Sequence, residues 1–201
     1  MSTHTAAKMG RPRGFAEDTA LEAAMRVFWE KGYEGATLGD LTDAMGINRS
    51  SLYASFGDKE TLFRLAIARY AEGPAAYLRK ALQQPTVRAV VAALLRGALE
   101  LLTDPRNPRG CLSVQGALAV GSDAQQMKQA MIQWRKQGGS DLQKRLQRAR
   151  AEGELAKDVN PGDLARYIST VITGLGVQAA NGSTRAEMAR VVDMVLRSMP
   201  L

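Results

Sequence analysis

The segment covering residues 37–56 constrains the fold of this chain more than any other stretch. It is typical of two short helices, the first capped by Thr37, with Gly46 between them. Glycine lets a chain reverse within three or four residues, and the apolar Met45 and Ile47 beside it would hold the two helices together. The pattern therefore predicts a helix-turn-helix.

The second of these helices has an inner and an outer face. Asn48 can cap it, and Leu52 and Phe56 are spaced to point inward. At ~100° per residue the outer arc spans about 140°, and it contains Arg49, Ser50, Tyr53 and Ala54. Such a face fits the major groove of DNA, where arginine can read guanine and serine is permissive. Ordinary helical pairs give the same pattern, and in that alternative Tyr53 is a half-buried packing residue.

Helical periodicity also dominates the rest of the chain, and no stretch alternates like a strand. Prolines, glycines and capping residues separate the expected helices, which cover 19–31, 37–45, 48–56, 58 to beyond 70, 86–103, 110–120, 123–152, 161–180 and 184–198. The sequence therefore predicts an all-α fold of about nine helices.

Aromatic residues and charges are unevenly distributed. Eight of the eleven aromatic residues lie in the first 70 residues, and a small domain needs such side chains to fill its core. The net charge is +3 over residues 1–14, −5 over residues 15–60 and +9 over residues 61–201, within a total of +7. We therefore predict a basic, flexible arm over 1–14, a helix-turn-helix domain over 15–60 and a larger helical domain over 61–201.

The composition argues against several other classes of protein. The longest apolar run, over residues 89–95, is far too short to span a bilayer, so no membrane partner is expected. A single cysteine fits the reducing cytoplasm. His4 is the only histidine and no phosphate-binding loop is present, so the sequence predicts no metal, no cofactor and no enzymatic activity.

The segment from Phe15 to about Phe63 resembles the DNA-binding domain of the TetR family of transcriptional regulators. The residues that carry the resemblance are Ala24, Phe28, Gly32, Tyr33, Thr37, Leu41, Met45, Gly46, Ile47, Leu52, and a ladder of Tyr53, Phe56, Lys59 and Leu62. The resemblance implies a homodimer that binds a palindromic DNA operator, usually as a repressor released by a small-molecule effector. Carried over by position, it implies that DNA is contacted by Thr37, Arg49, Ser50, Ser51, Tyr53 and Lys59. Ala54 and Ser55 depart from the pattern, because a second aromatic residue and a histidine are common there.

Arg11 and Arg13 precede this domain, in the basic arm. They can reach into a minor groove, as N-terminal arms of DNA-binding domains do. A solvated tail without DNA contacts is the alternative.

The larger domain is expected to bind the effector and to form the dimer. Its last two helices carry apolar stripes at helical spacing, and the resemblance favours a four-helix interface with a second subunit through Leu164, Ile168, Val171, Leu175, Val191, Val192 and Val195. An internal core is the alternative. The resemblance also implies a cavity among the central helices, for which the candidate lining residues are Tyr77, Leu78, Leu112, Gln115, Met127, Met131, Trp134, Tyr167 and Thr170.

Cys111 provides a second way to sense a signal. It follows Gly110 at an expected helix start, where the helix dipole and Arg106 or Arg109 would favour the reactive thiolate. Modification of this thiol would then release DNA, whereas a small buried apolar residue is the alternative. Two other functions also stay open: a helical small-molecule carrier and a non-specific, architectural DNA-binding protein.

Overall fold

A computed structural model describes residues 13–114 and 125–199 of the chain. Every regular element in these two ranges is a helix, which confirms the predicted all-α class. The helices are α1 (Arg13–Gly35), α2 (Leu38–Met45), α3 (Arg49–Phe56), α4 (Lys59–Glu72), the 3₁₀ helix η1 (Pro74–Ala76), α5 (Tyr77–Ala81), α6 (Val87–Thr103), α8 (Gln125–Ala151), α9 (Pro161–Ala180) and α10 (Arg185–Ser198).

The predicted helices agree with the observed ones to different degrees. α9 matches its predicted range, because Asn160 caps it and Pro161 occupies its first turn. α1 is longer than predicted, but its backbone leaves the helical conformation at Gly32, with φ 71° and ψ 177°. The helix predicted over 110–120 is seen only at residues 112–114, and the rest of it lies outside the described residues.

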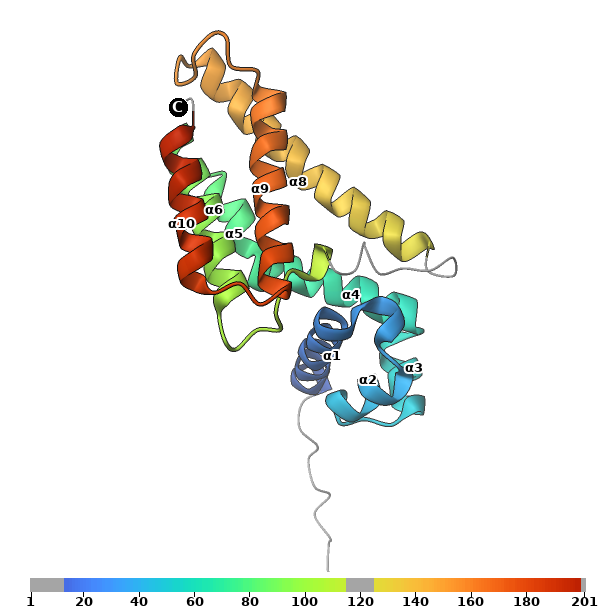
Figure 1. Ribbon diagram of the computed structural model, residues 1–201. Coiled ribbons are helices and arrows are strands. Elements are labelled where there is room, and N and C mark those ends of the chain that lie inside the picture. The colour runs from blue at the N-terminus through green and yellow to red at the C-terminus, as the bar shows by residue number, and fades with distance from the viewer. Residues whose placement is uncertain (1–12, 115–124, 200–201) are drawn as a thin grey trace, which may run out of the picture.

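Helices α1 to α4 form the part of the molecule that we call the head, residues 13–72. Figure 1 shows α1, α2 and α3 grouped at one end, with α4 running between them and the other helices. Aromatic rings fill the core of the head: Phe28 meets Phe63 edge-on at 4.9 Å between ring centroids, and Trp29 meets Tyr70 at 4.8 Å. These four side chains are almost completely buried, so the rings lock α1 against α4.

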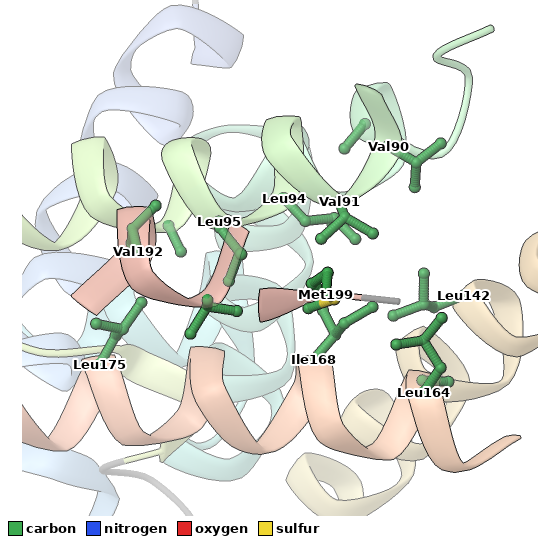
Figure 2. Close-up of a cluster of buried hydrophobic side chains, with 14 of the residues drawn as sticks. Val90, Val91, Leu94, Leu95, Leu142, Leu164, Ile168, Leu175, Val192 and Met199 are labelled. Carbon is green, nitrogen blue, oxygen red and sulfur yellow. The ribbon is translucent and has the colours of Figure 1, made fainter. Parts of the chain in front are cut away.

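The other described residues, 73–114 and 125–199, form the body, and its core is aliphatic. Helices α9 and α10 pack on α6, and α8 packs on α9. Figure 2 shows valines and leucines of α6 facing side chains from α8, α9 and α10. The body therefore closes around long helices without the rings that fill the head.

This core corrects most of the predicted subunit interface. Five of the seven predicted residues are buried within the chain itself: Leu164, Ile168, Leu175, Val192 and Val195. They belong to the core that α6, α8, α9 and α10 share, because an amphipathic helix first buries its apolar stripe against the neighbouring helices of its own domain. Of the predicted set, only Val171, which is half-buried, and Val191, which is exposed, are accessible to a second subunit.

None of the helices formed by residues 13–114 and 125–199 is long and apolar enough to cross a membrane.

Candidate nucleic-acid interface and effector cavity

The turn between α2 and α3 has the geometry predicted from its sequence. Gly46 ends α2 in the left-handed conformation, with φ 65° and ψ 31°, which glycine adopts without strain. The next residue, Ile47, donates its backbone N–H to the carbonyl of Thr42 at 3.1 Å. Thr42 is buried where the helices meet, and its hydroxyl donates to the carbonyl of Leu38 at 2.9 Å. The threonine therefore fits this tight position without leaving its hydroxyl unpaired.

Helix α3 presents a polar face to solvent. Leu52 and Phe56 are buried in the head, as predicted. The residues on the opposite side are exposed, namely Arg49, Ser50, Ser51, Tyr53, Ala54 and Ser55. Tyr53 is 51% exposed, so its ring is available for contacts outside the chain rather than serving as packing. Asn48 caps the helix by accepting hydrogen bonds from the backbone of Ser51 and the hydroxyl of Ser50, at 2.8 and 2.7 Å.

Thr37 is held by a capping box at the start of α2. Its hydroxyl accepts a hydrogen bond from the backbone of Asp40 and donates to the Asp40 carboxylate at 2.8 Å. Lys31 contacts the other carboxylate oxygen at 2.6 Å, and these hydrogen bonds hold the pKa of Asp40 well below its usual value. Because the hydroxyl proton of Thr37 is already used, the donors that this helix start can offer a phosphate are the first-turn backbone amides.

Lys59 is the first residue of α4, three residues after the end of α3. Its ammonium lies 4.7 Å from the centre of the Tyr33 ring, and burial lowers its pKa. A cation held over a ring is fixed in position and keeps its charge near the surface. Lys59 is half-buried, so part of this charge can reach a phosphate.

Four of the nine carboxylates in residues 15–60 have structural roles. Asp58 caps α4, and Asp40 is the acidic residue of the capping box at the start of α2. Arg69, from the second half of α4, contacts both Asp18 and Glu22 at 3.3 and 3.1 Å. The net charge of residues 15–60 therefore does not describe the surface that α3 presents.

A cavity of about 570 Å³ lies in the body, next to the end of α4. Its walls come from α4, α5, α6, α8 and α9, which Figure 1 shows around the centre of the molecule. Most of the walls are aliphatic, and three rings also contribute: Tyr70, Tyr77 and Trp134. Tyr77 packs against α6 at Gly97, where a larger residue would collide with the ring. Charged side chains also line the cavity, namely Glu72, Arg79, Arg135 and Asp141, so a cavity of this size suits a small molecule that is mainly apolar and carries polar groups.

The structure places only some of the predicted lining residues at this cavity. Of the predicted lining residues, Tyr77, Leu78 and Trp134 line it; Cys111, predicted as a possible redox sensor, also lies in its wall. Leu112, Met127 and Met131 instead belong to the buried cluster around the head, because the first half of α8 leans on that cluster. Tyr167 and Thr170 are exposed on α9, and Gln115 lies outside the described residues. Sequence reasoning missed Tyr70, Ser113 and Ile172, which line the cavity but belong to helices read as ordinary core.

Cys111 lies where the cavity meets the head. Its sulfur is 3.3 Å from the hydroxyl oxygen of Tyr70 and 3.1 Å from that of Ser113. Burial raises the pKa of Tyr70 well above its usual value, so the phenol keeps its proton. Arg106, expected near the thiol, is bound instead by Asp104, whose pKa it lowers to about 2. Arg109 has its guanidinium beside Gly182.

The remaining predicted DNA contacts can be placed only in part. Arg13 is the first residue of α1. Arg11 lies outside the described residues, and so does His4. Within the described part of the chain, no group of three or more histidine, cysteine or acidic side chains could hold a metal ion.

The short α2, the glycine turn and the exposed face of α3 together define a helix-turn-helix protein. Residues 20–66 match the family described as bacterial regulatory proteins of the tetR family, and residues 87–195 match the tetracyclin repressor-like C-terminal domain. The chain therefore belongs to the TetR family, whose members are DNA-binding transcriptional regulators and not enzymes.

Several individual proteins are similar to this chain over nearly its whole length. The transcriptional repressor ComR of Escherichia coli is 28% identical over 95% of this chain and 92% of its own length. The transcriptional regulator YezE of Bacillus subtilis is 31% identical over 93% of this chain and 96% of its own length. Among solved structures, a cysteine mutant of the TetR-family regulator CifR in complex with a 26 bp operator DNA has a TM-score of 0.88 and 42% identity. That match covers 95% of this chain and all of the other.

Proposed function

We propose that this protein is a repressor that binds a palindromic operator as a homodimer and leaves it when its body receives a signal. The observation that carries the proposal is the exposed face of α3, with Arg49 and Tyr53 accessible while Leu52 and Phe56 anchor the helix. Repressor function is supported by similar proteins such as ComR of Escherichia coli, which is a transcriptional repressor by name. A regulator of this kind works in the cytoplasm, where its DNA lies.

The proposed DNA contacts divide by role. Arg49, Ser50 and Tyr53 would face base edges in the major groove, with arginine reading guanine. Ser51, Lys59 and the start of α2 at Thr37 would hold phosphates, which position the helix but do not read sequence. Arg11 and Arg13 would enter the adjacent minor groove. The DNA-binding domain would then comprise residues 15–60, with the arm before it and the ligand-binding and dimerisation domain after it, although α4 contacts both.

The exposed apolar surface of α9 and α10 supports the dimer. We call this surface the apolar face, and its residues are Tyr167, Val171, Val177, Val191 and Met194. Val191 and Met194 of α10 are 45% and 63% exposed, and Tyr167 and Val177 of the neighbouring α9 are exposed as well, so the apolar side chains form a surface across the two helices. Gly174 has open space above it, so a second helix can approach closely there. A second copy of this chain, related by a two-fold axis, would cover the face.

The proposed signal is a small, mainly apolar effector in the body cavity. The tyrosine hydroxyls and Ser113 would orient it, and the leucine-rich walls would exclude water. Modification of Cys111 is the second candidate signal, supported by the position of the thiol in the cavity wall. Both would act by changing the separation of two heads that must lie about 34–36 Å apart to occupy successive major grooves.

Selection of bound genomic fragments by the purified protein tests the proposal. We expect the bound fragments to share a palindromic sequence. The protein should retain fewer of these fragments when the added oxidant acts as the signal, or when the added metabolite pool contains the effector. Enrichment without any shared sequence would indicate an architectural protein. Absence of retained DNA, with a metabolite recovered from the cavity, would indicate a carrier.

The dimer is tested separately by Met194→Asp, which places a charge on the apolar face. We expect the mass in solution at micromolar concentration to fall from a dimer to a monomer, and operator affinity to fall with it. Asp193→Asn, on an exposed neighbouring position of α10, is the matched control and should stay dimeric. A native protein that is already monomeric would contradict the proposed dimer.

A further inference from the structure

The head is attached to the body through α4, a continuous helix whose first half packs in the head and whose end lines the cavity. A second attachment is the segment of residues 104–114, which follows α6 and holds α1 by hydrogen bonds. A third is the first half of α8, whose Met127 and Met131 pack on the buried cluster of the head. The attachments besides α4 restrict how the head can turn about that helix.

Two hydrogen bonds from α1 make this second attachment. The indole N–H of Trp29 donates to the carbonyl of Gly110 at 2.9 Å, and this bond is buried. The guanidinium of Arg26 donates to the carbonyl of Arg106 at 2.7 Å, but this bond is exposed. A buried hydrogen bond is the more consequential of the two, because breaking it leaves polar groups without water to replace the partner.

Trp29 also touches the cavity wall through its ring. Tyr70 meets it edge-on at 4.8 Å, and the hydroxyl of Tyr70 is 3.3 Å from the sulfur of Cys111. Gly110 and Cys111 are adjacent in the sequence. The hydrogen bond of Trp29 to Gly110 and its ring contact with Tyr70, which in turn contacts Cys111, therefore both lead to the same segment of the chain. Behind Cys111, α9 approaches closely at Gly176, where an added Cβ would lie 3.3 Å from the Cβ of Cys111.

We propose that Trp29 is the positioning residue that transmits occupation of the cavity to the head. A group that enters beside Cys111 moves the 110–111 backbone and the Tyr70 ring, and both movements act on the indole of Trp29. Helix α1 then turns relative to the body and carries α2 and α3 with it, since its rings are locked to the rest of the head. This inference rests on the proposed function, because the movement matters only if α3 holds an operator.

A double-mutant cycle on operator affinity tests the inference without knowledge of the effector. Cys111→Met adds bulk at the cavity wall, and Trp29→Phe keeps a ring against Tyr70 but removes the donor to Gly110. We expect Cys111→Met to weaken operator binding about tenfold or more in the native background and less than about threefold in the Trp29→Phe background. Ser140→Met, on the exposed side of α8 outside the cavity, is the matched control and should have the same small effect in both backgrounds.

Equal effects of Cys111→Met in the two backgrounds would overturn the inference, and so would no effect in either. Both results leave the proposed function intact, because it fails only if the unmodified protein does not bind its operator.

A second measurement does not require Trp29→Phe to fold. The chain contains two tryptophans, so Trp134→Phe leaves Trp29 as the only indole. In that background, Cys111→Met should shift the fluorescence emission of Trp29 to shorter wavelength, because a buried indole that loses its carbonyl acceptor is stabilised less in its excited state. An unchanged emission spectrum would overturn the inference.

Discussion

The head and the body fill their cores with different side chains. In the head, Phe28, Trp29, Phe63 and Tyr70 meet edge-on within a few helices. In the body, leucine, valine and isoleucine side chains of long helices interdigitate, and a cavity of about 570 Å³ lies beside them. The two cores suit two different tasks. Aromatic rings give the small head one fixed shape, as a DNA-reading unit needs. The long helices of the body can enclose a cavity and shift when it is filled.

The surfaces of the two parts differ in the same way. The exposed side of α3 is polar, with Arg49 and Ser50, and suits DNA. The exposed side of α9 and α10 is apolar, with Val191 and Met194, and suits a second subunit. Each part therefore offers one partner surface, and the predictions below test whether the two parts behave as differently as they are built.

The largest expected effect is on the stability of the head core. Phe28→Ala removes a completely buried ring that contacts Phe63, and should lower the free energy of unfolding by about 3–5 kcal/mol. Trp134→Ala removes a half-buried ring at the edge of the cavity, and should cost roughly 1 kcal/mol. Urea unfolding measures both. Equal losses would show that the head core is not packed more tightly than the cavity wall.

The next effect is on the salt dependence of operator binding, which shows which basic residues contact the DNA phosphates. Replacing Arg11 and Arg13 by alanine should make the slope of log affinity against log salt concentration shallower by about four, because each of the two subunits loses two arginines and each arginine neutralises one phosphate of the operator. Replacing Lys144 and Arg148 by alanine, on the exposed side of α8, should leave the slope unchanged. Operator titrations at several salt concentrations measure the slope. The opposite result would move the DNA surface from the head to the body.

The smallest expected effect is the acid sensitivity of the two capping boxes, one in each part. Thr37 and Asp40 begin α2, and Thr184 and Glu187 begin α10. Hydrogen bonds lower the pKa of both carboxyls, so each stabilises the fold above its unfolded pKa of about 4 and loses that effect as the pH falls towards its folded value. Asp40→Asn should therefore reduce the fall in melting temperature between about pH 5 and pH 2.

Glu187→Gln should reduce that fall less, because Glu187 lacks the lysine contact that Asp40 makes with Lys31. Thermal unfolding at a series of pH values measures both variants. A larger change for Glu187→Gln would contradict the role given to Lys31.

Sequence reasoning predicted the head better than the body. Caps, the turn glycine and the inward residues of α3 are local features, so residues 37–56 could be read directly. The short α5 was missed because Pro74 and a length of five residues leave no periodicity to recognise. The apolar stripe of α9 was assigned to a second subunit, although Ile168 and Leu175 are buried in the core of the body, since one helix can carry apolar residues on two sides.

The cavity was the hardest part to predict. Met131 and Trp134 lie one turn apart on α8 and both pack against the head cluster, yet only Trp134 of the two also lines the cavity. Which side of α8 meets the cavity depends on the angle at which α8 crosses its neighbours, and no local pattern contains that angle. The contact between Trp29 and Gly110 is equally hidden, because it joins residues far apart in the sequence.

The central claim is that α3 reads DNA sequence from its exposed face. A gel-shift titration of Arg49→Ala on the selected operator and on unrelated DNA tests it most directly. We expect operator affinity to fall by about 1–3 kcal/mol while affinity for unrelated DNA changes little, so the preference for the operator narrows. An Arg49→Ala protein that binds the operator as tightly and as selectively as the native protein would contradict the account.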